Sequence, residues 1–381
     1  MSGKPRLLII SFSVIERDAR VLRQIRLFAD DYEVTTLGHG EAPAGVARHI
    51  RVPDGLRAND VNGRLITLRQ YTPAYWRTSA ISWARKNLEP GGWDIVLANE
   101  ADAVPLALRL KPRRGVHADL HEYHPRVKEE LPLWNRRIRP YVEHLCRRFV
   151  SRADSWTTVG EGIAAEYERM FGFRPEVVAN AAPYQEREAE PASTPLRLVH
   201  SGGAVRARHL ELTVQAVRDS DLDATLDLYL TPNDPAHLQE LKDLAAQSAG
   251  RVRVLDPVPY AQLADTIAAY DVGIHVLPPV NFNHLWALPN KLYDYVQARL
   301  AVVIGPSPEM ARIVSEHGFG VVADGFETAD LVRVLDALTP ESVTRMKHAA
   351  AEAAPALASD AEDEGWRRAI DALAQKGAVT R

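Results

Sequence analysis

The chain has 381 residues, of which 46% are hydrophobic and 25% charged, and its formal net charge is -4 at pH 7. This composition is typical of a soluble globular protein and excludes the basic surface of a nucleic-acid-binding protein. The length predicts two domains of roughly 150 to 200 residues each. The single cysteine, Cys146, rules out an internal disulfide. No apolar run reaches the roughly 18 residues that span a bilayer, and the first one, Leu7 to Ile10, lacks a cleavage site, so we expect a cytoplasmic protein.

In the first half, short apolar runs that predict buried strands alternate with apolar residues at helical spacing. The expected strands are 6–13, 32–37, 93–98, 115–120, 155–159 and 176–179, and the expected helices are 18–30, 71–87 and 161–171. This pattern predicts a doubly wound parallel sheet. The loop after the first strand contains no glycine, so the fingerprint for NAD is absent.

A polar cluster follows the strand 115–120 and contains Asp119, His121, Glu122 and His124. We expect no metal there, because the spacing of these histidines is not that of a zinc motif. His121 ordinarily titrates near neutral pH, so it is a candidate for proton chemistry in a cleft. The alternative is a solvated polar loop.

Residues 126–152 form a stretch rich in arginine and aromatic residues, here called the basic segment. We expect it to be helical. Such a face can contact anionic lipid or an acidic acceptor, which would place the protein peripherally at the inner face of the membrane. The alternative interpretation is a solvated charged surface.

The segment 181–195 is rich in proline and acidic residues and predicts a linker. We therefore expect an N-terminal domain at 1–180 and a C-terminal domain at 196–358. The helix expected over 359–381 carries apolar residues that should pack back on the body. The second domain is also expected to be doubly wound, with strands at 196–200, 224–230, 251–255, 272–277 and 301–304.

Two places in the second domain predict phosphate contacts. Gly202 and Gly203 follow the strand 196–200 and allow a ligand to approach closely, and Arg206 or Arg208 can bind phosphate. After the strand 272–277, a helix is expected to open at Pro289-Asn290-Lys291, with Pro289 at its first position. Its N-terminus and Lys291 favour a diphosphate, and Asp294, one turn on, can accept from ribose hydroxyls. The alternative is an ordinary helix start with a solvated lysine and aspartate.

The segments HSGGAVRARHLELTVQAV, DPVPYAQLADTIAAYDVGIHVLP and LPNKLYDYVQARLAVVIG together resemble the donor-binding half of retaining GT-B glycosyltransferases of the GT4 type. In the first half, DARVLRQ, DLHEY and VGEGIAAEYERMFGFRPEVVAN are similar to the same family. The resemblance covers nearly the whole chain. It implies the GT-B architecture, with two Rossmann-like domains facing a cleft.

The resemblance also implies roles for single residues on the donor side. Arg208 corresponds to a lysine that binds the pyrophosphate. Gly203 stands where many members have an arginine, so Arg206 is a candidate to replace it. Asp294 corresponds to a glutamate that binds ribose hydroxyls. Val258 corresponds to the position whose backbone contacts the nucleotide base.

This sequence departs from the family at Trp286, where a second glutamate is usual. Asn281, Asn283 and His284 therefore become the candidates for recognition of the donor sugar. On the acceptor side, His121 corresponds to a histidine between donor sugar and acceptor. We expect His121 and acidic groups nearby, such as Glu122, to orient the acceptor, and Asp18 is a further candidate at the cleft.

The resemblance thus implies a retaining glycosyltransferase that needs no metal or cofactor and moves a sugar from a nucleotide diphosphate sugar to an acceptor hydroxyl. In such a reaction the leaving phosphate oxygen can itself take the acceptor proton. Two alternatives stay open: a GT-B nucleotide-sugar 2-epimerase and a non-catalytic nucleotide-sugar-binding protein. The sequence does not specify the base, the sugar, the acceptor or the oligomeric state.

Overall fold

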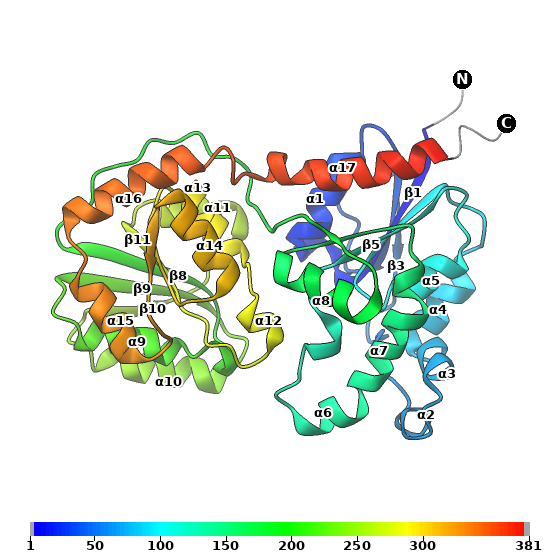
Figure 1. Cartoon of the computed structure of the whole chain (residues 1–381), viewed down its shortest axis with the longest axis horizontal. Coiled ribbons are helices and arrows are strands. Elements are labelled where there is room, and N and C mark those ends of the chain that lie inside the picture. Colours follow the sequence, from blue (N-terminus) through cyan, green and yellow to red (C-terminus); the bar gives the residue numbers. More distant parts are fainter. Residues whose placement is uncertain (1–3, 377–381) are drawn as a thin grey trace. The chain divides into compact units, whose positions relative to one another are not determined.

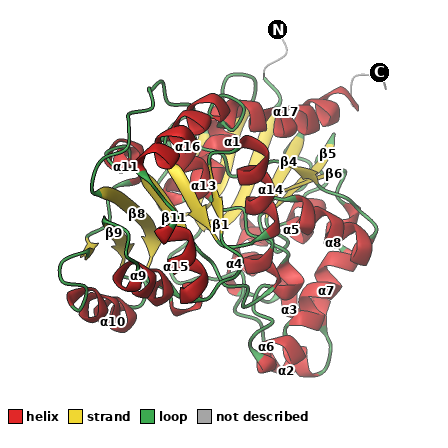
Figure 2. Cartoon of the chain, turned by 60° about the vertical axis from the view of Figure 1, so that its left-hand side comes forward, coloured by secondary structure: helices red, strands yellow, loops and turns green. Residues whose placement is uncertain are grey.

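A computed structural model describes residues 4–376, which divide into two compact units. Among these residues, unit 1 comprises 4–179, 281–283 and 363–376, and unit 2 comprises 180–280 and 284–362. Each unit contains one parallel β-sheet flanked by helices (Figures 1 and 2). None of the described helices is both long and apolar enough to cross a membrane.

The sheet of unit 1 has the strand order β3-β2-β1-β4-β5-β6-β7. Its central strands are buried runs of aliphatic residues, as expected for a parallel sheet covered on both faces. The strands are β1 (Arg6–Val14), β2 (Glu33–His39), β3 (Arg48–Arg51), β4 (Ile95–Asn99), β5 (Gly115–Leu120), β6 (Ser155–Thr158) and β7 (Glu176–Val177).

The helices of unit 1 include α1 (Ala19–Phe28), which packs with the C-terminal helix α17 (Ser359–Lys376) in one apolar core against β1 and β4. Figure 1 shows α17 running alongside α1 in this unit. The others are α2 (Gly63–Thr67), α3 (Tyr71–Trp76), α4 (Ser79–Asn87), α5 (Val104–Arg109), α6 (Pro132–Arg137), α7 (Arg139–Arg148) and α8 (Glu161–Phe171), with 3-10 turns η1 (Ile15–Arg17), η2 (His124–Arg126) and η3 (Val150–Arg152).

The sheet of unit 2 has the order β10-β9-β8-β11-β12-β13. The chain adds β9 and β10 on one side of the first strand, β8, and then adds β11, β12 and β13 on its other side, so the direction of winding reverses at β8, as it does at β1 in the sheet of unit 1. Ligands of open α/β sheets bind beyond the carboxyl ends of the strands at such a switch point, here between β8 and β11. The strands are β8 (Leu196–Gly203), β9 (Ala224–Thr231), β10 (Val252–Leu255), β11 (Val272–His275), β12 (Ala301–Ile304) and β13 (Gly320–Val322).

Helices cover both faces of the second sheet. Figure 1 shows α9, α10 and α15 on one side of it and α13, α14 and α16 on the other. The helices are η4 (Arg206–Arg208), α9 (Leu210–Asp219), α10 (Pro235–Ala246), α11 (Tyr260–Ile267), α12 (Phe282–Leu285), α13 (Asn290–Gln297), α14 (Pro308–His317), α15 (Thr328–Asp336) and α16 (Pro340–Ala353).

Several expected boundaries differ from those of the structure. The helix expected over 71–87 is two helices, α3 and α4, which are interrupted at Arg77 and Thr78. The basic segment is broken into short pieces because Pro132 and Pro140 each start a new helix. Pro289 is the N-cap of α13 and not its first helical residue. The glycines expected to follow the strand 196–200 instead form the end of β8.

Candidate functional site

In unit 2, two cationic side chains from different elements converge on Gly202. Gly202 lies at the carboxyl end of β8, Arg208 lies in η4, and Lys291 lies in the first turn of α13. A Cβ atom at Gly202 would lie 2.8 Å from Cε of Lys291 and 3.2 Å from a terminal nitrogen of Arg208. Only glycine leaves this space open. The arrangement gives a small cationic recess at the edge of the sheet where ligands of this fold class bind.

The two cations have little compensating charge around them. Neither Lys291 nor Arg208 takes part in an ion pair among the described residues. Burial and the neighbouring charge of Arg208 lower the pKa of Lys291 to about 8, against the weaker opposing effect of Asp294. Burial also lowers the pKa of Arg208. Two close cations without partners form a site that an anion with two or more charges would stabilise.

Two buried histidines lie beside this recess. The rings of His200 and His275 are stacked with centroids 5.6 Å apart. Nδ1 of His200 lies 2.9 Å from the carbonyl oxygen of Ile274, whereas Nε2 of His200 and both ring nitrogens of His275 have no hydrogen-bond partner in the described part of the chain. Burial and the charge of Lys291 lower the pKa of His200 to about 3 and that of His275 well below its ordinary value. Both imidazoles are therefore neutral and can each donate a proton from one nitrogen.

The other residues predicted for donor binding are distributed more widely. Asn290 is the first residue of α13, and Asp294 is buried one turn further on the same helix. Val258 lies partly buried in the loop after β10. His284 belongs to unit 2, and its charge lowers the pKa of His275. Asn283 groups with unit 1, where its Oδ1 accepts from the Tyr123 N–H at 2.7 Å, and its role in donor binding stays a prediction.

Arg206 has other partners than those expected from the sequence. Its guanidinium pairs with Glu240 at 2.6 Å and with Asp234 at 3.3 Å, and the side chain is 56% exposed. Gly203 approaches Asn233, which leaves no room for a side chain there. A phosphate contact by Arg206 stays a prediction, and the phosphate would have to compete with the carboxylates of Glu240 and Asp234 for the guanidinium group.

In unit 1, His121 stands between two carboxylates. Its Nε2 lies 3.1 Å from Asp119, and its Nδ1 lies 3.1 Å from Glu100. The other oxygen of Glu100 lies 3.2 Å from Nδ1 of His124. Burial alone would lower the pKa of His121, but Glu100 and the hydrogen bond with Asp119 raise it above its ordinary value. The imidazole is thus held in place at both nitrogens, and protonation is favoured.

Asp119 is a fully buried anchor of this cluster. Its carboxylate accepts two hydrogen bonds from Arg20, each at 2.7 Å, one from Gln24 at 2.7 Å and one from Thr157 at 2.6 Å. Although burial opposes ionisation, the Arg20 guanidinium holds the pKa of Asp119 well below its usual range. Such a carboxylate fixes the orientation of His121 and does not itself exchange a proton near neutral pH.

The remaining catalytic candidates have different environments. Glu122 is exposed beside His121 in sequence, and its backbone carbonyl accepts from Tyr167 at 2.8 Å. Asp18 is the N-cap of α1, where Oδ1 accepts from the Val21 N–H at 3.2 Å. The cap gives Asp18 a structural role. Catalytic roles for Glu122 and Asp18 stay predictions.

Glu100, which links His121 to His124, was not predicted as a site residue. Glu100 directly follows β4, and its backbone has φ = +71°, a left-handed conformation that is uncommon for residues other than glycine. Burial raises the pKa of its carboxyl group although both histidines oppose this. Its place after the strand 93–98 was the available signal, since the carboxyl ends of adjacent parallel strands meet at one edge.

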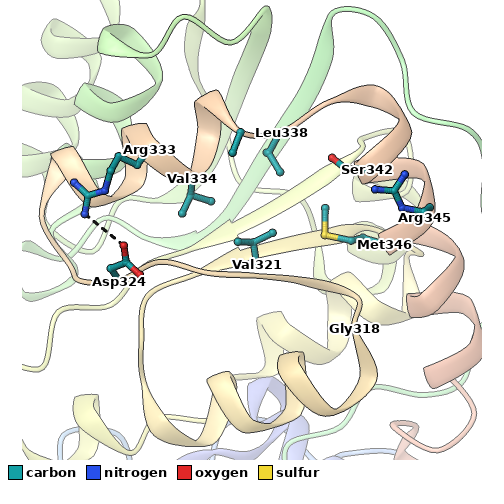
Figure 3. Close-up of a pocket in the computed structure, with 10 residues that line it drawn as sticks. Gly318, Val321, Asp324, Arg333, Val334, Leu338, Ser342, Arg345 and Met346 are labelled. Carbon is teal, nitrogen blue, oxygen red and sulfur yellow. Dashed lines mark ion pairs between the residues drawn. The ribbon is translucent and has the colours of Figure 1, made fainter.

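Other features lie outside these two groups. Unit 2 contains a pocket of about 450 Å³, and Figure 3 shows part of its lining, including Val321, Val334, Leu338 and Met346. It contains none of the predicted site residues. Within the described part of the chain, no three histidine, cysteine or acidic side chains are grouped so that they could hold a metal ion.

The chain was compared with known proteins. It matches no protein-family model and none of the curated proteins. Among solved structures it is similar to sucrose-phosphate synthase from Thermosynechococcus elongatus, with a TM-score of 0.69 and 14% identity over 97% of this chain and 99% of that one. Anabaena HepE in complex with UDP-glucose gives a TM-score of 0.68 and 14% identity over 96% and 99% of the two chains. A glycosyltransferase from Rickettsia africae gives a TM-score of 0.69 and 10% identity over 98% of this chain and 99% of that one.

At these identities the likeness is one of fold. Two parallel-sheet α/β units of seven and six strands, together with these neighbours, define the chain as a GT-B fold protein. The expected fold class is thereby confirmed.

Proposed function

We propose that this protein is a glycosyltransferase that moves a sugar from a nucleotide diphosphate sugar to an acceptor hydroxyl. The observation that carries the proposal is the convergence of Arg208 and Lys291 on Gly202 beside the N-terminus of α13. Charge accumulates on the diphosphate as the bond to the sugar breaks. Two cations and free N–H groups fixed at that place stabilise the leaving group without reorganising.

The donor in this proposal is a uridine diphosphate sugar in the first instance, because the similar HepE structure contains UDP-glucose. Asp294 would accept from the ribose hydroxyls, and the backbone near Val258 would contact the base. His275 can offer one neutral N–H donor beside the same recess, whereas the N–H of His200 donates to the Ile274 carbonyl and leaves its Nε2 as an acceptor.

On the acceptor side, His121 would orient the acceptor hydroxyl, with Asp119 and Glu100 fixing its ring. The resemblance to GT4 enzymes supports transfer with retention. In that course the departing phosphate oxygen accepts the hydroxyl proton, so no separate protein base is required.

The first test is a thermal-shift screen of nucleoside diphosphates and their sugars. A ligand present at about 100 times its Kd raises stability by about 2.7 kcal/mol, which such a screen detects. Sugar transfer from the stabilising donor is then followed by NMR, which reports the anomeric configuration of the product. No stabilisation by any nucleoside diphosphate would overturn the proposal.

Metal independence is a further part of the proposal. The cations of the recess can balance the diphosphate where other enzymes use a divalent ion. We predict that transfer persists in excess EDTA. Loss of turnover with EDTA that magnesium or manganese restores would contradict this.

A nucleotide-sugar 2-epimerase is the second candidate function, and the Glu100 cluster favours it. Burial raises the pKa of both Glu100 and Asp102, and carboxyl groups of this kind suit acid and base steps. An epimerase converts the sugar nucleotide without an acceptor. Conversion of the donor alone would therefore support it, whereas turnover that requires an acceptor supports the transferase. Tight nucleotide binding without any turnover would favour a non-catalytic binding protein.

We also propose that the basic segment contacts an anionic lipid surface peripherally. Leu131 and Leu133 are 49% and 60% exposed, and Leu68, next to α2, is 69% exposed. Arg137 joins these elements, since it donates to Oγ1 of Thr67 at 2.7 Å. Exposed leucines among arginines suit the headgroup region of a membrane. Sedimentation with phosphatidylglycerol vesicles tests this, and equal recovery of wild type and Leu131→Ser/Leu133→Ser would contradict it.

A further inference from the structure

Unit 1 contains a pocket of about 370 Å³ that the preceding proposal does not use. One wall comes from α6, α7 and the residue between them, which contribute Trp134, Ile138, Tyr141, Val142 and Leu145. Tyr141, Val142 and Leu145 share one face of α7 at helical spacing, and Trp134 and Ile138 extend this apolar wall beyond the start of α7. The volume is at the lower end of the range for small-molecule sites in proteins.

The opposite end of the pocket is polar. Asp102, in the turn after β4, and His124 both line it. His124 shares the Glu100 carboxylate with His121, at 3.2 Å and 3.1 Å. A single carboxylate therefore separates the pocket from the histidine that we propose to orient the acceptor.

The charges of the lining limit what can bind. The described lining carries one carboxylate, one lysine, one histidine and one amide side chain, and Trp134 and Tyr141 add an indole N–H and a hydroxyl group to its apolar wall. This set gives no strong preference for an anion or a cation, and the other lining side chains are aliphatic, which favours a ligand with an apolar body. Polar groups that enter an apolar chamber without hydrogen bonds lose free energy.

We propose that this pocket binds the acceptor substrate, which is an uncharged alcohol with an apolar body. The apolar body lies against the face of α6 and α7. The hydroxyl group lies at the other end, where it donates to Asp102 and accepts from His124, and His121 acts on its position through the Glu100 carboxylate that it shares with His124. This inference rests on the proposed transferase function and adds the chemical class of the acceptor. The same chemistry is found in an aromatic alcohol and in an isoprenoid alcohol.

The test measures binding to the full chain without any donor, so that it does not depend on transfer. The probes are 2-naphthol, farnesol and, as a polyol, glucose, and binding is followed by calorimetry. Ile138→Trp fills the pocket from its partly exposed wall and should weaken binding of the alcohol about tenfold or more, because the apolar body loses its space. Lys86→Trp is the control in the same unit, since Lys86 is exposed on α4 and does not line the pocket. It should leave affinity unchanged.

The polar end is tested with a matched pair of ligands. 2-Naphthol should bind about tenfold more tightly than naphthalene, which lacks the hydroxyl group, as expected for a hydrogen bond to a charged group. Asp102→Leu should abolish this difference while naphthalene binding persists. A difference that survives in Asp102→Leu would overturn the placement of the hydroxyl.

The outcomes separate the two proposals. Binding of 2-naphthol alone supports an aromatic acceptor, and binding of farnesol supports an isoprenoid one. Binding of neither, binding that Ile138→Trp leaves unchanged, or binding of glucose alone would overturn the inference. Failure of the transferase proposal gives a different result, in which the alcohols bind but no nucleoside diphosphate does.

Discussion

Lys291 is the residue whose charge state controls the proposed donor site. Its pKa is lowered from 10.5 to about 8, so the free protein loses this charge within an accessible pH range. A bound diphosphate favours the protonated form, and binding is therefore linked to proton uptake above pH 8. We predict that nucleoside diphosphate affinity falls by up to about tenfold per pH unit above the titration, since one unit corresponds to about 1.4 kcal/mol.

Calorimetry at pH 7 and pH 9 measures this linkage, and Lys291→Arg is the control. An arginine stays charged throughout this range, so the affinity of the variant should not depend on pH even if its absolute value changes. A wild-type affinity that is equal at both pH values would show that Lys291 does not contact the diphosphate.

The histidine cluster of unit 1 gives the second prediction at this scale. Glu100 raises the pKa of His121 and holds Nδ1 at 3.1 Å. We predict that His121→Ala lowers kcat on the order of 10² to 10⁴, because the acceptor hydroxyl loses the group that orients it for transfer. Glu100→Gln should lower kcat in the same direction and move the titration of His121 to lower pH. The Kd of the nucleotide should change less than about threefold in both.

The assay compares steady-state kinetics with calorimetry on the same samples, and NMR follows the imidazole titration. Near wild-type turnover of His121→Ala would reduce the cluster to a polar loop. Loss of nucleotide affinity instead of turnover would place His121 on the donor side.

At the scale of elements, α17 ties the C-terminus of the chain to the sheet of unit 1. Trp366 is fully buried, and the guanidinium groups of Arg20 and Arg23 lie 4.5 and 4.7 Å from its ring. Its Nε1 donates to Thr157 at 3.2 Å. Because Arg20 and Thr157 also hold Asp119, this helix supports the acceptor-side cluster from behind.

We predict that Trp366→Ala destabilises unit 1 by about 3 to 5 kcal/mol, the usual cost of removing a buried large aromatic side chain. Arg368→Ala is the control on the same helix, since this side chain is 62% exposed, and it should cost about 0.5 kcal/mol or less. Denaturant unfolding of both variants measures the difference. Equal midpoints would mean that α17 contributes little to the stability of unit 1.

The sequence predicts an element well when one pattern dominates it. The strand 115–120 and the helix 161–171 have the predicted bounds, because apolar and polar residues alternate along the strand and the helix contains a full amphipathic period. The edge strands β3 and β13 were not predicted, since they are short and only partly buried. The basic segment was expected to be continuously helical, but its prolines interrupt it.

The candidate site was predictable only where a residue acts through its own type and position. Gly202, Arg208 and Lys291 could be chosen because a glycine at a strand end and cations near helix starts have a direct physical meaning. Glu100 and the pair His200 and His275 could not. Their proximity depends on the pairing of strands, such as β8 beside β11, that are far apart in the sequence.

At the scale of the whole molecule, both sheets have the same winding, with the first strand of each unit beside the switch point. The alternation of strands and helices in each half made this architecture predictable, because a parallel strand needs a crossover and the crossover is right-handed. In unit 2 this topology brings together the segments that follow β8 and β11, which carry Arg208 and Lys291 of the proposed donor site. In unit 1 it brings Glu100 and His121 together, because they directly follow the neighbouring strands β4 and β5.

The most direct measurement is the affinity of the chain for the nucleoside diphosphate that stabilises it most. We predict that Arg208→Ala and Lys291→Ala each weaken binding by about 1.5 to 3 kcal/mol, the range for hydrogen bonds to charged groups. Arg312→Ala is the control in the same unit, because the Arg312 side chain is 57% exposed and pairs with Glu316 on α14, and it should change binding by about 0.5 kcal/mol or less. Unchanged affinity in both Arg208→Ala and Lys291→Ala would contradict the placement of the donor site at Gly202.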